Sequence, residues 1–418
     1  MVIKIKAFVN IDLFFIYYII QSMNIEQLLK NEEQRQSQTI SMVASENIAS
    51  KRVRNALGSV LTNKYAEGYP GARYYSGCEI ADEIETAAIE NLKKLFDCKW
   101  GNVQAHSGSQ ANQAVYSALL TPGDRVLALE LKSGGHLTHG ASVNSSSKFY
   151  DFKHYTINSN SEVDMNEVEK LAKEFKPKMI ICGASAYPRN WNWKEFSRIA
   201  KEVNAYLFAD IAHIAGLIAG KGLENPAKYV DVMTSTTHKT LRGPRGGVVF
   251  SNNLEIGKKI DRAMFPGIQG GPLMGTIAAK AIAFEEALQP EFVNYTKNVL
   301  DNAQTLSKKI TQAGGKLLTG GTDNHLMILD CRSFGMDAKE TEALLNEANI
   351  LLSVSALLED SWKKPNGIRL GTPYITTLGI EDISEFADLF VSTLKTKNAI
   401  ELKKFVESNA KKLYNKFL

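Results

Sequence analysis

The chain has 418 residues, which is enough for two or three domains with a large core. Hydrophobic residues make up 44% of the sequence and charged residues 22%, as in ordinary globular proteins, so a disordered chain is excluded. The 49 basic and 45 acidic residues give a net charge of +4. This balance is too even to indicate a nucleic-acid partner or a membrane surface.

The four cysteines, Cys78, Cys98, Cys182 and Cys331, lie far apart in the sequence. They form no CxxC pair and no zinc-type Cys/His spacing, so we expect neither a disulfide framework nor a structural zinc site. The pattern is typical of the reducing cytoplasm, which is the predicted location.

The first 22 residues contain the apolar run Leu13–Ile20. This run is shorter than the roughly 20 residues that a membrane span needs, and no small-residue cleavage site follows it. We therefore expect residues 1–22 to be an extension, Met23 to start the functional chain, and no stable membrane association. A membrane tether is the alternative.

Residues 23–50 are predicted to form an N-terminal arm, with helical spacing over residues 25–42. Beyond it, short apolar runs alternate with helical patterns such as Glu79–Phe96, which predicts a mostly parallel α/β sheet in a large domain over residues 51–289. The predicted strands are Arg125–Leu129, Met179–Cys182, Tyr206–Ala209, Val230–Met233 and Val248–Phe250.

Pro290 interrupts the helical pattern that begins at Met274. The helices and strands predicted after it indicate a smaller α+β domain over residues 290–418. They are the helices Phe292–Ala313, Ala338–Ala348 and Ile383–Lys395 and the strands His325–Asp330 and Gly367–Leu370.

One lysine, Lys239, lies in a glycine-rich turn between two predicted strands, close to Arg242 and Arg245. A lysine amine forms a Schiff base with an aldehyde when its surroundings let it lose its proton, and nearby arginine charge lowers its pKa. From these residues alone, a solvated lysine on a surface turn is an equal alternative.

An acidic residue, Asp210, ends the predicted strand that lies upstream of Lys239. The carboxyl ends of parallel strands border the crevice where α/β sheets bind ligands. A carboxylate there can keep a pyridine nitrogen protonated, which makes pyridoxal phosphate an electron sink. The alternatives are a helix cap for Asp210 and a core position for the nearby His213.

Several long motifs, together with the segment around Lys239, resemble the serine hydroxymethyltransferase family. These motifs are Asn63–Gly71, His106–Asn112 and Gly134–Gly140. The resemblance extends from about Asn24 to the C-terminus and is densest up to Gly275. It implies a fold-type-I pyridoxal-phosphate enzyme with a seven-stranded-type sheet in the large domain. It also implies a reversible conversion of serine and tetrahydrofolate to glycine and 5,10-methylenetetrahydrofolate.

A phosphate site is expected where Ser107–Ser109 precede a helix, because free backbone N–H groups and serine hydroxyls bind anions. An ordinary serine N-cap is the alternative. The resemblance places the cofactor's phosphate there. The residues that it implies for cofactor binding are Ser107, Gly108, Ser109, His136, Ser185, Asp210, His213, His238, Lys239 and, from the partner subunit, Gly270 and Gly271.

The resemblance also implies roles in catalysis and substrate binding. The catalytic residues would be Lys239, Glu67, Tyr65, His136 and Thr236, with Glu67 and Tyr65 entering the neighbouring subunit's site in a homodimer. The substrate carboxylate would be held by Ser45, Tyr75 and Arg369, and the folate would contact Glu67, Leu131, Gly135, His136 and Leu137. We expect no metal, because His136 and His139 have no third ligand at a sensible spacing.

The folate side departs from the family pattern over residues 353–366, where Ser355 replaces an asparagine that would contact the pterin. A folate-independent pyridoxal-phosphate aldolase acting on β-hydroxy amino acids is therefore the second hypothesis. A non-catalytic or RNA-binding member of the fold is the third. The presence of Lys239, Asp210 and Arg369 and the lack of a basic aromatic tract argue against it.

Overall fold

The computed structural model describes residues 24–158, 160–361 and 363–415. The run Leu13–Ile20 and Met23, on which the expectations about the start of the chain depend, lie outside these ranges. None of the helices within them combines the length and the apolarity that crossing a membrane requires.

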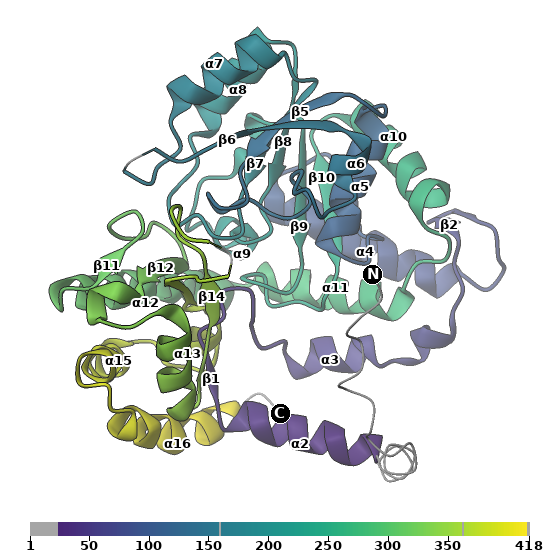
Figure 1. Ribbon diagram of the computed structural model, residues 1–418. Coiled ribbons are helices and arrows are strands. Elements are labelled where there is room, and N and C mark those ends of the chain that lie inside the picture. The colour runs from purple at the N-terminus through teal and green to yellow at the C-terminus, as the bar shows by residue number, and fades with distance from the viewer. Residues whose placement is uncertain (1–23, 159, 362, 416–418) are drawn as a thin grey trace, which may run out of the picture.

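The centre of the molecule is a seven-stranded sheet in the order β4-β10-β9-β8-β7-β5-β6 (Figure 1). Only β10 runs against its neighbours, so the prediction of a mostly parallel α/β sheet is confirmed. The strands are β4 (Trp100–Asn102), β10 (Gly247–Ser251), β9 (Val232–Thr236), β8 (Tyr206–Asp210), β7 (Met179–Gly183), β5 (Arg125–Leu129) and β6 (Asp151–Tyr155).

Side chains alternate between the two faces of this sheet, as a strand requires. In β7, Ile180 and Cys182 belong to the core cluster that includes α4, α8 and α11, whereas Met179 and Ile181 belong to the cluster that includes α5 and α10. Both faces are thus covered by helices, which explains why the strands are continuous apolar runs. The helices of this part are α3 (Lys51–Leu57), α4 (Glu79–Phe96), α5 (Gly108–Leu119), α6 (Ser146–Phe149), α7 (Met165–Phe175), α8 (Trp193–Glu202), α9 (Ala215–Ala219), α10 (Leu254–Arg262) and α11 (Met274–Ala287).

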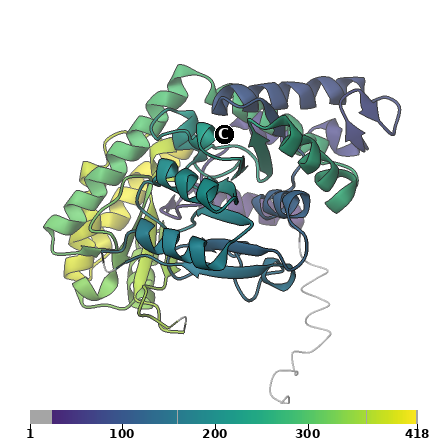
Figure 2. The same ribbon diagram turned by 90° about the horizontal axis from the view of Figure 1, so that it is seen from above.

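The C-terminal part has a separate core and an antiparallel four-stranded sheet, β11-β12-β15-β14. Figure 2 shows its green and yellow elements gathered on one side of the molecule. Its strands are β11 (Lys316–Leu317), β12 (Leu326–Asp330), β13 (Ile350–Leu351), β14 (Ser353–Ser355) and β15 (Gly367–Gly371), and its helices are α12 (Pro290–Gln312), α13 (Ala338–Glu347), α14 (Pro373–Thr377), α15 (Ser384–Thr396) and α16 (Ile400–Tyr414). The domain boundary near residue 290 stays a prediction.

The N-terminal arm differs from the continuous helix that the spacing over residues 25–42 predicts. The helix α2 (Ile25–Ser37) ends early, because β1 (Ile40–Ser41) pairs in parallel with β13. Ile40 and Met42 are fully buried in the C-terminal core. The arm is therefore integrated into that core through its last third, and α2 packs against α16.

Candidate active site

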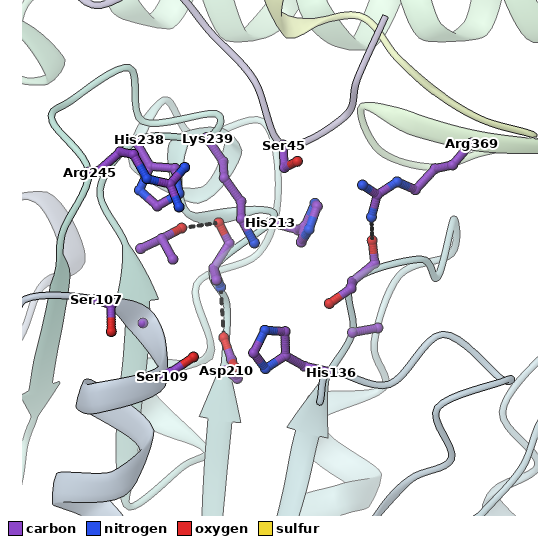
Figure 3. A pocket seen from close by; sticks show the side chains of 15 residues that line it. Ser45, Ser107, Ser109, His136, Asp210, His213, His238, Lys239, Arg245 and Arg369 are labelled. Atoms are coloured by element: carbon purple, nitrogen blue, oxygen red, sulfur yellow. Dashed lines mark hydrogen bonds between the residues drawn. The ribbon is translucent and has the colours of Figure 1, made fainter. Parts of the chain in front are cut away.

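A cavity of about 300 Å³ opens beside the carboxyl ends of β8 and β9. Figure 3 shows Lys239 projecting into it, with Asp210 at a strand tip below and Arg369 on the side opposite the serines of α5. The lining residues are Ser45, Ser107, Gly108, Ser109, His136, Ala184, Ser185, Asp210, Ala212, His213, Thr236, His238, Lys239, Arg245 and Arg369. The fold thus brings together twelve positions that the sequence singled out.

Asp210 is held at the tip of β8 by three hydrogen bonds. Asn112 Nδ2 and His139 Nε2 donate to its Oδ2 at 2.9 and 3.1 Å, and the backbone N–H of Ala212 donates to Oδ1 at 3.1 Å. Burial alone would raise the pKa of this carboxyl, but the hydrogen bond and the charge of His139 outweigh it, so the pKa lies well below its ordinary value. The carboxylate is therefore ionised and fixed in direction, as an acceptor for a protonated ring nitrogen must be.

Lys239 lies in the turn that leads from β9 back into β10. This turn is closed by backbone hydrogen bonds from Gly243 N to Thr237 O at 2.7 Å and from Thr237 N to Gly246 O at 3.2 Å. Burial lowers the pKa of Lys239 to about 8. The charge of Asp210 acts against this shift, and the charges of Arg369 and Arg245 add to it. Near neutral pH about a tenth of this amine is therefore neutral and able to attack an aldehyde, and this fraction reaches one half at about pH 8.

The first turn of α5 presents an anion site to the cavity. Ser107 caps the helix by accepting a hydrogen bond from the Gln110 N–H at 3.1 Å, and it also lines the cavity. The two alternatives from the sequence, an N-cap and a cavity residue, are therefore both true. The neighbouring backbones are very close, because a Cβ on Gly247 would lie 2.2 Å from Ser107 O and one on Gly108 would lie 2.7 Å from Thr236 Cγ2. The glycines therefore let β9 and β10 pack closely against this turn, and the N-terminus of a helix favours the binding of an anion.

His238, which also lines the cavity, has a buried nitrogen without a partner among the described residues. The Nδ1 of His238 is buried without a hydrogen bond, and burial lowers the pKa of its imidazole to about 3. The amine of Lys239, the accepting carboxylate of Asp210, the α5 turn and this imidazole together fit an aromatic aldehyde that carries a phosphate.

Arg369 lies on β15 and reaches the cavity from the C-terminal part. Its Nη1 donates to Ser185 O at 2.7 Å and its Nε to Ser353 Oγ at 3.3 Å. Among residues 24–158, 160–361 and 363–415, no carboxylate forms an ion pair with it. A partly buried guanidinium without an anionic partner is suited to grip a ligand carboxylate.

The imidazole of His136 is held by Thr138, whose Oγ1 lies 2.7 Å from its Nδ1. Burial lowers the pKa of His136 to about 4, so the ring is neutral, which suits stacking on an aromatic ligand. The absence of a third ligand was the ground for expecting no metal, and this ground was wrong. The Asp210 carboxylate lies within 4.8 Å of nitrogen atoms of both His136 and His139. The hydrogen bond between His139 and Asp210 gives both groups another role, and the expected lack of a metal stays a prediction.

Five expected residues do not line this cavity but form a cluster elsewhere on the same chain. Tyr65 OH donates to Glu67 Oε1 at 3.4 Å, and the rings of Tyr65 and Tyr75 meet edge to face at 5.1 Å. Gly270 and Gly271 lie against them, since a Cβ on either would come 2.9 Å from Glu67 Oε1 or Tyr65 Cζ. Tyr65 and Tyr75 are 55% and 46% exposed, so the cluster is accessible to a second subunit.

The expected folate residues do not all line the same cavity. Leu131 and Gly135 line a second cavity of about 290 Å³ together with Val354, Ser355 and other residues of the altered segment. Leu137 is 46% exposed and lines neither of these two cavities.

The charge of Arg245 lowers the pKa of Lys239, as its place in the Lys239 turn predicts, and its side chain also lines the cavity. Sequence reasoning missed Asn112 and His139, which orient Asp210, because they are 98 and 71 residues distant from it in sequence.

Comparison with known proteins gives a consistent result. A family model described as serine hydroxymethyltransferase matches residues 20–390. A protein named serine hydroxymethyltransferase from Wolbachia sp. subsp. Drosophila simulans is 51% identical over 399 residues, covering 94% of each chain. Proteins with the same name from Deinococcus deserti and Orientia tsutsugamushi are 53% and 54% identical, covering 88% and 86% of this chain and 92% and 85% of their own.

Proposed function

The chain belongs to the serine hydroxymethyltransferase family, a group of fold-type-I transferases of serine and glycine metabolism, and we propose that it uses pyridoxal phosphate and tetrahydrofolate to interconvert serine and glycine. The observation that carries the proposal is the convergence of Lys239, Asp210 and Arg369 on one cavity. These side chains come from a turn, a strand tip and a separate sheet. Asp210 is ionised, and the lowered pKa of Lys239 makes its neutral form more populated than in an exposed lysine.

The residues of the cavity fit pyridoxal phosphate. Lys239 would hold the aldehyde carbon, Asp210 the pyridine nitrogen, and the first turn of α5 the phosphate. Ser185, His213, Thr236 and His238 would contact the rest of the cofactor. When bound, the cofactor supplies an electron sink for the carbon from which the hydroxymethyl group departs.

The chain's own groups orient the amino acid. Arg369 would bind the substrate carboxylate in bidentate fashion, with Ser45 beside it. Because the carboxylate is fixed, the orientation of the other substituents of the α-carbon is fixed too, and this orientation determines which bond can break. Lys239, with its pKa near 8, can accept and return a proton at this site.

The proposal includes a homodimer with shared sites. The cluster of Tyr65, Glu67 and Tyr75 is outside the chain's own cavity and partly exposed, which supports its donation to a partner's cavity. Glu67 would handle the proton of the serine hydroxyl group or of the one-carbon unit, and Gly270 and Gly271 would complete the partner's phosphate site. A cytoplasmic location is supported by four free, buried cysteines.

A folate-independent aldolase remains the second candidate. Ser355 and its neighbours form a wall of the cavity that contains Leu131 and Gly135, so the altered segment borders the expected folate position. Weak folate binding with intact cofactor chemistry would produce cleavage of β-hydroxy amino acids without transfer.

The cofactor assignment is tested by trapping. Pyridoxal phosphate is reduced onto the purified protein with borohydride, and the modified peptide is identified by mass spectrometry. We expect the adduct on Lys239 and its loss in Lys239→Ala. A stoichiometric adduct on another lysine would refute the assignment. The buried Lys280, whose Nζ donates to three backbone carbonyls, serves as the internal comparison.

A further inference from the structure

A buried ion pair lies directly behind the loop that carries Glu67. The side chains of Arg73 and Glu85 are 4% and 1% exposed and are joined by an Nη2–Oε2 contact of 2.5 Å, while Arg73 Nε donates to Asp82 at 2.7 Å. A buried ion pair is weak evidence for stability, because the cost of desolvating the charges offsets their attraction. Its contacts with the loop suggest another reason for its presence.

The pair fixes the backbone on both sides of Glu67. Arg73 Nη1 donates to the carbonyls of Ala66 and Gly68, both at 2.9 Å, and the carbonyl of Glu67 itself accepts the Tyr74 N–H at 3.1 Å. Three consecutive carbonyls are thus occupied. The backbone around Glu67 cannot rotate without breaking hydrogen bonds to a buried charge.

Gln104 connects the ion pair to the segment that contains Gly270 and Gly271. Its Nε2 donates to Glu85 Oε1 at 2.8 Å and to Gly68 O at 2.9 Å. Its Oε1 accepts the Nε2 of Gln269 at 2.9 Å, and Gln269 precedes Gly270 and Gly271 in the chain. One hydrogen-bond network therefore holds the loop of Glu67 and the segment of Gly270 and Gly271, which together form the cluster described above.

We propose that Arg73 and Glu85 are positioning residues that hold Glu67 and Tyr65 in the conformation in which they enter the partner subunit's active site. The inference rests on the shared-site homodimer proposed above. It assigns the pair a role in the neighbouring site and none in the cavity of the subunit that carries it.

Two hybrid dimers with the same substitutions test this role. In the split hybrid, one chain carries Arg73→Met and the other Lys239→Ala, so the intact Lys239 receives a loop with the native Arg73. In the same-chain hybrid, one chain carries both changes, so the intact Lys239 receives a loop without Arg73. Each hybrid is isolated through two different affinity tags.

We expect the same-chain hybrid to have a kcat about tenfold to a hundredfold below that of the split hybrid, because small displacements of a catalytic group have effects of this size. Pyridoxal phosphate content should be equal in the two, since each has one intact cofactor pocket. Equal kcat values would overturn the inference, because a merely structural role does not depend on which chain carries the change.

Two further variants separate the positioning role from a loss of folding. If Arg73→Met leaves Glu85 too costly to bury, Arg73→Met with Glu85→Gln removes both charges and should show the same asymmetry. Arg52→Met is the control, because Arg52 is exposed and, among the described residues, pairs with the exposed Glu285 at 3.1 Å and the partly buried Glu286 at 3.8 Å. It should give equal rates in both arrangements.

Glu67→Gln, tested in the same two arrangements, separates this inference from the proposed function. Asymmetry for Glu67→Gln without asymmetry for Arg73→Met would overturn only the positioning role. Equal rates for Glu67→Gln would overturn the shared sites and the inference with them.

Discussion

Lys239 is the residue whose surroundings most directly determine its chemistry. Burial brings its pKa to about 8, below the ordinary lysine value of 10.5. Between pH 8 and 10.5 the folded chain therefore binds fewer protons than the unfolded chain at this position. The contribution of Lys239 to stability thus rises with pH over this window and is least favourable below pH 8.

The same shift predicts the pH at which the cofactor is captured. Only the neutral amine attacks an aldehyde, so the initial rate of borohydride-trapped incorporation at Lys239 should be half-maximal near pH 8. Incorporation at exposed lysines of the same sample should keep rising toward pH 10.5. A midpoint near 10.5 for Lys239 would show that its surroundings do not favour the neutral form.

At this scale the sequence predicted the groups that lie within local motifs and missed those brought in by folding. Lys239 and Asp210 each follow an apolar strand, and a side chain at the end of a parallel strand must border the crevice. Asn112 and His139 contact Asp210 only because α5 and the His136–Gly140 turn meet above the sheet. No pattern in the sequence marks that meeting.

At the scale of elements, Gly183 sets how closely β7 approaches β8. It pairs with Asp210 in the sheet, and a Cβ at this position would lie 2.3 Å from the Asp210 carbonyl oxygen and 2.8 Å from its Cβ. Gly183→Ala must push the two strands apart. We expect a loss of about 1–3 kcal/mol in unfolding free energy by urea titration, with weaker binding of pyridoxal phosphate.

Gly58→Ala is the matched control for this change. Among the described residues, a Cβ on Gly58 would have one atom within 4 Å, Arg54 O at 3.8 Å, so neither stability nor cofactor affinity should fall appreciably. An equally small effect of Gly183→Ala would contradict the close approach of the two strands.

The short strand β14 carries Ser355 at the wall of the expected folate cavity. A serine hydroxyl cannot present the paired donor and acceptor of an amide, so Ser355→Asn should tighten tetrahydrofolate binding about tenfold in the presence of glycine. Equilibrium binding measures this, with exposed Ser361→Asn as the control. Unchanged affinity in Ser355→Asn would show that this position does not contact the folate.

Long helices and central strands were predictable, because their apolar periodicity is strong. The helix Glu79–Phe96 and the strand Arg125–Leu129 have the predicted limits. The short β4 and β14 were not predicted, since strands of three residues carry no periodicity. The arm was predicted as one helix because its pairing with β13 is a contact across about 310 residues of sequence.

At the scale of the whole molecule, the cavity lies between two hydrophobic cores. Asp210 ends β8 of the large sheet, Lys239 lies in the turn that joins β9 to β10 of the same sheet, and Arg369 belongs to the sheet of the C-terminal part. The sequence could predict both parts but not their contact, because it is made by residues far apart in sequence, such as Arg369 and Ser185. The place of Glu67 outside this cavity could be predicted only from the family resemblance.

The most direct test of the account is glycine formation from serine by the full chain loaded with pyridoxal phosphate, measured with and without tetrahydrofolate. Hydroxymethyl transfer predicts a rate that rises with tetrahydrofolate to saturation and is lost in Lys239→Ala. A rate that does not respond to saturating tetrahydrofolate, with threonine cleaved at least as fast as serine, would contradict the transferase function and favour the aldolase.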